Sequence, residues 1–186
     1  MKKENILSDL VLIEKYQKGD VNSLNHLVKR WHLKFCNFAL WIVKDTDIAK
    51  DIAQESWTII IGKLVTLKEP NKFKSWAISI VNRKAIDYLR AINKEKNKLK
   101  LYYNETEKES LFIDLDDNTI LKKELLNAIQ NLSIEHQMVI RLFYKESYNL
   151  KEISEILKVS VGTTKSRLFH AREKLKVKLK NRNYEE

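Results

Sequence analysis

The stretch Asn149-Leu-Lys-Glu-Ile-Ser-Glu-Ile-Leu-Lys-Val-Ser-Val-Gly-Thr-Thr-Lys-Ser-Arg-Leu-Phe-His-Ala-Arg172 decides the fold of the C-terminal part of this chain. Asn149 and Glu152 have the spacing of a capping box at the start of a helix. Apolar residues then recur at helical spacing, at Leu150, Ile153, Ile156 and Leu157. Lys158-Val-Ser160 predicts a tight turn, after which Ser160 can cap a second helix. The stretch therefore predicts two helices joined by a tight turn.

The second of these helices has two chemically different faces. We expect one face to be buried, and it carries Val161, Thr164, Leu168, Ala171 and Leu175. The opposite face and its flanks carry Thr163, Ser166, Phe169 and His170, with Lys165, Arg167 and Arg172 beside them. Hydroxyls, apolar contacts and Arg or Lys side chains are the groups that read major-groove edges. The pattern predicts a helix-turn-helix whose second helix is a recognition helix. The alternative is an ordinary helical hairpin with a solvated basic face.

The composition favours helices and a polyanionic partner. The chain has 186 residues and a formal net charge of +10, with one Pro and three Gly. So few turn-forming residues disfavour β architecture, and the positive charge favours binding to nucleic acid. The fold class that we expect is all-α.

No cofactor, metal or membrane insertion is expected. Cys36 is the single cysteine, which excludes a disulfide framework and a multi-cysteine zinc site. His32 and Cys36 have helical spacing, but two donors without further ligands do not predict a metal site. No apolar run approaches the roughly 18 residues of a membrane span, and no signal peptide is apparent. We therefore expect an intracellular, cytoplasmic protein.

The charge pattern divides the chain into two parts. Residues 72–100 are strongly basic, whereas residues 104–110 and 114–117 are acidic and lose helical periodicity. We expect two small helical domains, residues 1–93 and 119–186, joined by a flexible acidic linker at residues 94–118. The linker could repel DNA, fill a basic channel or serve only as a solubilising tether.

Four helices are predicted in the N-terminal domain, near residues 9–19, 21–43, 46–64 and 73–93. The third carries a compact stripe of polar and acidic residues, Asp47, Asp51, Gln54, Glu55 and Thr58, which we call the acidic stripe. In a protein this basic, the acidic stripe favours a protein-binding surface over a nucleic-acid surface. Catalysis is disfavoured, because neighbouring carboxylates on an exposed helix are usually only solvated.

The fourth helix and the loop before it form a second candidate DNA surface. Its buried side is predicted to hold Ala77, Val81, Ala85, Tyr88 and Leu89. The residues predicted to face DNA are Asn71, Lys72, Lys74, Ser79, Asn82, Arg83, Asp87 and Arg90. Lys and Arg side chains bind phosphates, and the other polar side chains can contact the edges of nucleobases. The alternative is that Asp87 only pairs with Arg83 or Arg90 along the helix, and that Asn71 only caps it.

Three motifs in order resemble one family. They are Asp51-Ile-Ala-Gln-Glu-Ser-Trp57, Phe73-Lys-Ser-Trp76 followed by Ala85-Ile-Asp-Tyr-Leu-Arg90, and the segment from Val161 to Leu175. Together they resemble the extracytoplasmic-function group of bacterial RNA polymerase sigma factors, over about residues 9–178. The resemblance implies a non-enzymatic factor that binds core polymerase, recognises the minus-ten and minus-thirty-five promoter elements, and assists promoter melting.

The resemblance also assigns roles to residues. It implies that Asp47, Asp51, Gln54 and Glu55 dock on the clamp helices of the largest polymerase subunit. The loop around Asn71 would capture a flipped base of the non-template strand. The recognition helix would read the minus-thirty-five element through Thr163, Lys165, Ser166, Arg167, Phe169 and His170. The linker would occupy the RNA-exit path, and sequestration by an anti-sigma factor is common in the family.

Three positions depart from the family pattern. Many relatives have Arg-Asn where this chain has Asn82-Arg83, His170 stands where Arg is frequent, and the usual Leu-Pro is Leu132-Ser133.

Two other classes of protein are the alternatives. A stand-alone helix-turn-helix repressor or activator would not need the acidic stripe. A nuclease or recombinase would need metal carboxylates or an active Ser or Tyr, and no such constellation is visible.

Overall fold

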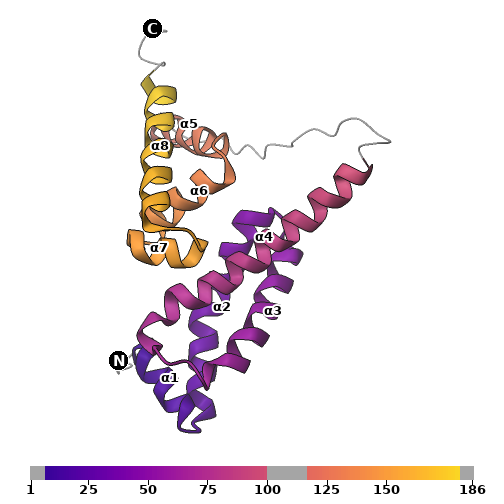
Figure 1. Cartoon of the computed structure of the whole chain (residues 1–186), viewed down its shortest axis with the longest axis vertical. Helices are drawn as coiled ribbons and strands as arrows, with labels where there is room; N and C mark the ends of the chain where they lie inside the picture. The colour runs from indigo at the N-terminus through magenta and orange to yellow at the C-terminus, as the bar shows by residue number, and fades with distance from the viewer. Residues whose placement is uncertain (1–6, 100–116, 181–186) are drawn as a thin grey trace. The chain divides into compact units, whose positions relative to one another are not determined.

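The computed structural model describes residues 7–99 and 117–180, and these form two compact helical units (Figure 1). The division between the units falls between Tyr103 and Asn104. Most of the predicted linker, residues 100–116, lies outside the described residues. Each unit has its own core and is described by itself.

The first unit contains the four helices expected from the sequence and one additional short helix. They are α1 (Asp9–Gln17), α2 (Val21–Val43), α3 (Thr46–Leu64), the 3-10 helix η1 (Pro70–Lys72) and α4 (Phe73–Leu99). The helix α4 continues six residues past the predicted end at Asn93, into the range assigned to the linker. The added segment, Lys94-Glu-Lys-Asn-Lys-Leu99, has neither Gly nor Pro and consists largely of good helix formers. Nothing in its local sequence stops the helix.

Side-chain caps fix where these helices begin. Ser8 accepts a hydrogen bond from the backbone N–H of Val11, Asp20 accepts one from Asn22, and Asp45 accepts two at the start of α3. Each cap satisfies a backbone donor that has no partner within the helix. Lys44, in the left-handed conformation with φ of 60°, ends α2 and lets α3 begin after a connection of two residues.

The core of the first unit is a cluster of aromatic rings between α2, α3 and α4. Phe35 and Trp57 have ring centroids 5.0 Å apart, and Trp31 lies 5.7 Å from Phe73 in an edge-to-face arrangement. Phe73 is the first residue of α4, so this contact anchors the start of that helix on α2. Asp9 accepts hydrogen bonds from Arg30 Nη1 and from Trp31 Nε1, which attaches α1 to the same helix.

The second unit contains four α-helices and a π-helical turn. They are α5 (Asp117–Gln130), α6 (Ile134–Ile140), η2 (Arg141–Lys145, the π-helical turn), α7 (Leu150–Leu157) and α8 (Val161–Lys180). The helix α6 continues directly into η2, and α8 packs against α5, α6 and α7 (Figure 1). The core of the second unit includes Val139, Leu142, Ile153, Ile156, Leu168 and Ala171.

Local hydrogen bonds explain the helix-turn-helix geometry. The capping box predicted for Asn149 and Glu152 is present with both of its hydrogen bonds. Lys158 is left-handed, with φ of 53°, and this residue ends α7 and turns the chain into α8. Ser133 occupies the N-cap position of α6, but its hydroxyl lies 3.1 Å from His136 Nδ1 instead of capping a backbone N–H. Among residues 7–99 and 117–180, no helix is long and apolar enough to cross a membrane.

Candidate nucleic-acid and polymerase interfaces

The helix α8 has the buried and exposed faces expected of a recognition helix, with one exception. Thr164, Leu168 and Ala171 are buried against the rest of the unit, and Leu175 is half-buried. Val161, which was predicted to be buried, is 47% exposed. It is the first residue of α8 and follows directly on the turn, so the packed face of the helix begins only at Thr164.

The outer face of α8 presents hydroxyls and an exposed aromatic ring. Ser160 caps the helix by accepting a hydrogen bond from Thr163 N, and the two hydroxyls of these residues lie 2.8 Å apart. Phe169 is 59% exposed and stacks edge-to-face on His170, with ring centroids 5.4 Å apart. Ser166 is also exposed. This surface has polar hydrogen-bonding groups and one apolar contact side by side.

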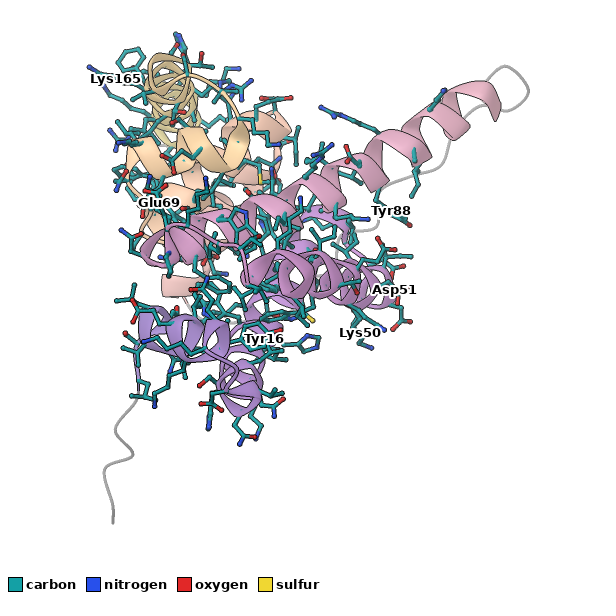
Figure 2. The ribbon with its side chains drawn as sticks, turned by 60° about the horizontal axis from the view of Figure 1, so that its bottom comes forward. Tyr16, Lys50, Asp51, Glu69, Tyr88 and Lys165 are labelled. Atoms are coloured by element: carbon teal, nitrogen blue, oxygen red, sulfur yellow. The ribbon has the colours of Figure 1, made fainter. Side chains whose placement is uncertain are left out.

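Two basic flanks border this outer face. Lys165 and Arg172 lie on one flank, and Arg167 and Lys174 lie on the other, as the helical period requires. Figure 2 shows Lys165 pointing away from the helix. A helix that enters a major groove has a phosphate backbone on each side, and these flanks place Lys and Arg side chains toward both backbones.

Arg172 is fixed by two aromatic residues that the sequence pattern did not single out. Its Nε donates a hydrogen bond of 2.7 Å to the hydroxyl of Tyr144. Its guanidinium carbon also lies 5.4 Å from the ring centroids of both Phe143 and Tyr144. Both aromatic residues come from η2, whereas Arg172 comes from α8. The signal in the sequence is an adjacent Phe-Tyr pair, which periodicity alone does not assign to a site.

Residues of α6 modify the electrostatics of the opposite flank. The pKa of Glu135 is lowered by its hydrogen bonds and by the nearby charge of Arg167. The pKa of His136 is also lowered, chiefly because burial disfavours the charged imidazolium, and further by the charges of Lys174, His170 and Arg167. His136 is therefore biased toward its neutral form beside this basic flank.

The acidic stripe is fully exposed along α3. Asp51 and its neighbour Lys50 point outward from the helix in Figure 2. Asp47 pairs with Lys50 at 3.0 Å, and Glu55 accepts a hydrogen bond of 2.7 Å from Lys84 of α4. Asp51 has no ion pair with any residue in the described part of the chain, and exposed pairs such as the other two are weak. The stripe is therefore an open surface with one unpaired carboxylate at its centre.

The loop before α4 is held by a residue of α1 that the sequence did not indicate. Gln17 Nε2 donates hydrogen bonds to the carbonyl oxygens of Leu64 and Leu67, at 2.9 and 3.0 Å. Glu69 pairs with Lys72 across η1 at 2.8 Å. Asn71 is exposed, and within the described residues its side chain makes no capping bond to α4. Asn71 is the middle residue of η1, and its side chain is exposed to solvent.

The outer face of α4 carries exposed charges arranged around one carboxylate. Asp87 lies between Arg83 and Arg90, with N–O distances of 3.7 and 3.5 Å. Both contacts are longer than a hydrogen bond, and all three side chains are exposed. The pairing considered as an alternative is therefore present, and it orders the two arginines on one side of the helix. Lys74 is half-buried, and Ser79 donates its hydroxyl hydrogen to the carbonyl of Trp76.

The burial of Asn82 contradicts the prediction that this residue lies on the exposed minus-ten surface. It is only 8% exposed, and its Oδ1 is buried without a hydrogen-bond donor. It lies one helical turn from Ile78 and one residue from Val81, both of which are in the core. Asn82 therefore belongs to the buried side of α4 and is not on the exposed surface that was predicted to contact DNA. Tyr88 and Leu89, which were expected to be buried, are only half-buried.

Metal ligation has no support in the described part of the chain. Cys36 Sγ lies 3.6 Å from His32 Nε2, but no third His, Cys, Asp or Glu joins them. Burial raises the pKa of the Cys36 thiol, which favours its protonated form.

Comparisons with known proteins agree with the motifs. A family model of sigma-70 region 2 matches residues 27–95, and a model of sigma-70 region 4 matches residues 128–177. The chain is 31% identical over 151 residues to the RNA polymerase sigma factor SigV of Bacillus subtilis, covering 78% of this chain and 84% of that protein. It is 28% identical over 182 residues to the ECF RNA polymerase sigma-E factor of Haemophilus influenzae, covering 93% of this chain and 96% of that protein.

Two solved structures share the fold. One is the sigma factor RpoE in complex with the anti-sigma factor NepR from Bartonella quintana, with a TM-score of 0.66, 20% identity, and coverage of 86% of this chain and 98% of that one. The other is CnrH in complex with the cytosolic domain of CnrY, with a TM-score of 0.62, 17% identity, and coverage of 93% and 97%.

Two helical units in this order, the second a helix-turn-helix, define a promoter-recognising transcription initiation factor. The chain belongs to the extracytoplasmic-function (ECF) group of RNA polymerase sigma factors.

Proposed function

We propose that the two units divide the work of a sigma factor between them. Residues 1–93 bind core RNA polymerase and the minus-ten element, residues 119–186 bind the minus-thirty-five element, and residues 94–118 connect them. The observation that carries this division is the open acidic stripe on α3 in one unit and the basic recognition helix α8 in the other. The protein acts by binding alone and contributes no catalytic group. Its action on polymerase and promoter places it in the cytoplasm.

The acidic stripe is the proposed contact with the polymerase clamp helices. Asp47, Asp51, Gln54 and Glu55 lie on one face of α3 and are all exposed. Of these, Asp51 is the best single probe, because Asp47 pairs with Lys50 and Glu55 pairs with Lys84. A carboxylate without an ion pair among the described residues can bind a Lys or Arg side chain of the partner without first losing such a pair.

A charge reversal at Asp51 tests this contact. We expect Asp51→Arg to weaken binding to core polymerase about tenfold or more, because juxtaposed like charges cost several kcal/mol at an interface. The thermal unfolding temperature should stay near the wild-type value, since the position is exposed. The matched control is Glu14→Lys, the same change of charge on the exposed side of α1. Wild-type affinity of Asp51→Arg for core enzyme would contradict the assignment.

The recognition helix is the proposed minus-thirty-five contact. Thr163, Ser166, Phe169 and His170 face the base edges, and Lys165, Arg167 and Arg172 lie on the flanks that meet phosphates. Replacing Lys165 by Ala should weaken binding to all promoter sequences and reduce the salt slope by about one. Ser166→Ala and Phe169→Ala should change which bases are tolerated, by about 1–3 kcal/mol per altered contact. Selection from randomised duplexes that returned one consensus for all three variants would contradict this assignment.

The proposed minus-ten surface consists of the loop before α4 and the exposed side of that helix. Asn71 offers both a donor and an acceptor to a flipped base, and Lys72, Lys74, Arg83 and Arg90 supply positive charge for the neighbouring phosphates. Ser79 and Asp87 support this surface, since the first donates to the backbone and the second orders the two arginines. Asn71→Ala should slow strand opening and alter minus-ten preference, with binding to core polymerase unchanged. Permanganate footprinting measures the opening, and wild-type preference in this variant would leave Asn71 without a role in base capture.

We also propose that an anti-sigma factor regulates this protein. The two structural neighbours were each solved with such a partner or with a cytosolic domain bound to them. An anti-sigma factor would need to cover the acidic stripe or the recognition helix to prevent initiation. Co-purification of the tagged full chain from its own cells, followed by competition with core polymerase, tests this proposal. A co-purifying protein that does not compete with core enzyme would contradict it.

A further inference from the structure

Tyr144 is a large aromatic side chain that remains 57% exposed on the π-helical turn η2. Its ring packs edge-to-face on Phe143, with centroids 5.1 Å apart, and this contact fixes the direction of the phenol. The hydroxyl accepts a hydrogen bond from Arg172 Nε and makes no other hydrogen bond to a described residue. A phenol both accepts and donates. Because the acceptor side is used, the hydroxyl hydrogen remains available for an acceptor outside the unit.

Arg172 is left with the complementary set of donors. Its Nε is bound to Tyr144, whereas its Nη1 and Nη2 make no hydrogen bond or ion pair with any residue in the described part of the chain. The two rings of η2 hold the guanidinium carbon at 5.4 Å from each centroid. An arginine ordered in this way loses little further freedom when its planar fork binds an anion.

These donors lie on the flank of α8 that also carries Lys165. The helical period places Arg172 and Lys165 on the same side of the outer face, away from Arg167. The guanidinium of Arg172 and the phenol hydroxyl of Tyr144 therefore meet on one side of the recognition helix, and Lys165 lies about two turns earlier on the same side. A tetrahedral oxyanion accepts several hydrogen bonds at once, and the anions beside a major-groove helix are backbone phosphates.

We infer that Tyr144 and Arg172 form one phosphate-binding site, in which the Tyr144 hydroxyl and the Nη groups of Arg172 donate to the same backbone phosphate of promoter DNA. The inference rests on the proposed promoter-binding role of α8 and adds to it a residue, Tyr144, from outside the helix-turn-helix. Tyr144 acts here in two ways: it contacts the phosphate, and it orients Arg172 through Nε. The site sets affinity and the register of α8 on the duplex, and it reads no base.

Phosphate neutralisation at single positions tests the site. Holoenzyme is assembled from the full chain and core polymerase, and its binding is measured to a duplex selected by the wild-type holoenzyme. A series of such duplexes carries one methylphosphonate at each successive position across the minus-thirty-five element. The variants are Tyr144→Phe, which keeps the ring and removes the hydroxyl, and Arg172→Lys, which keeps the charge and removes the fork. Lys165→Ala is the control on the same flank.

We expect Tyr144→Phe to bind the unmodified duplex about ten- to a hundredfold more weakly, as for the loss of one hydrogen bond to a charged group. At one methylphosphonate position the loss should disappear, and Arg172→Lys should lose its effect at that same position. Losses that simply add at every position would overturn the site. So would wild-type binding by Tyr144→Phe and Arg172→Lys when Lys165→Ala binds weakly. If Lys165→Ala also binds every duplex like the wild type, the promoter-binding role of α8 itself is contradicted.

Discussion

Gln17 offers a sharp test of how the first unit holds the loop before α4. The perturbation is Gln17→Met, which preserves the length of the side chain and removes its amide. The wild-type amide bonds two carbonyl oxygens, Leu64 O and Leu67 O, that lie 47 and 50 residues away in the sequence. Both bonds are partly buried, so water only partly replaces the lost donor.

The size of the effect follows from these two bonds. A hydrogen bond contributes about 0.5–1.5 kcal/mol net, so we expect the free energy of unfolding of the first unit to fall by about 1–3 kcal/mol. For a domain of this size, each kcal/mol corresponds to a decrease of about 4–8 °C in the unfolding temperature. Calorimetry of the full chain measures this loss. The loop that carries Asn71 should also be less well positioned, and strand opening should be slower.

The second unit provides a matched control. Gln137 Nε2 donates to the carbonyls of Gln130 and Leu132 at 2.9 and 2.8 Å, which is the same chemistry in a different place. Gln137→Met should therefore destabilise its own unit, by somewhat less because one of its two bonds is exposed, and should leave strand opening unchanged. Fluorescence of a base analogue in the minus-ten element follows the opening. Equal slowing by both variants, or an unchanged unfolding temperature for Gln17→Met, would refute the reasoning.

Three further outcomes are expected. Asn149→Ala should lower the stability of the second unit by about 1 kcal/mol, because it removes the cap of α7; a urea titration of the full chain that shows no change would contradict the capping role. Asn82→Leu should raise the stability of the first unit by about 1 kcal/mol, since it replaces a buried acceptor that has no donor, and it should leave minus-ten binding intact; weaker DNA binding would restore Asn82 to the DNA surface. The pKa of His136 is lowered from 6.5 in the folded unit, so the unfolded chain binds more protons as the pH falls below 6.5. Stability should therefore fall as the pH drops through this range, and His136→Gln should reduce that fall; identical pH profiles by thermal unfolding would contradict this cause.

The features that the sequence predicted correctly are those set by neighbouring residues. The capping box at Asn149 and the alternation of faces in α8 both depend on residues within one or two helical turns. The periodicity of α2 likewise matches its bounds at Val21 and Val43. Local hydrogen bonds and a period of 3.6 residues determine these features, and both are visible in a single sequence.

The features that were missed depend on tertiary packing. Asn82 was predicted to adjoin the DNA-facing side of α4, but it is buried in the unit in which α4 packs on α2 and α3. Val161 is apolar and was assigned to the core, but as the first residue of α8 it stays 47% exposed, and the packed face of the helix begins at Thr164. Gln17 and Tyr144 act on residues far away in the chain, and no periodic pattern connects them to those partners. The resemblance to a family supplied the roles of the surfaces, and the structure supplies the contacts that support them.

The π-helical turn η2 makes the number of residues between α6 and α7 a constraint in itself. The backbone N–H of Glu146 bonds to the carbonyl of Arg141, five residues earlier, where an α-helix would bond four residues back. This turn therefore contains one residue more than an α-helical turn would. A chain shorter by one residue here could close an ordinary helical turn with no loss of hydrogen bonds. The loss of that residue would rotate the phenol of Tyr144 away from Arg172. The two aromatic rings of η2 would then no longer hold the guanidinium of Arg172 at the edge of the recognition helix.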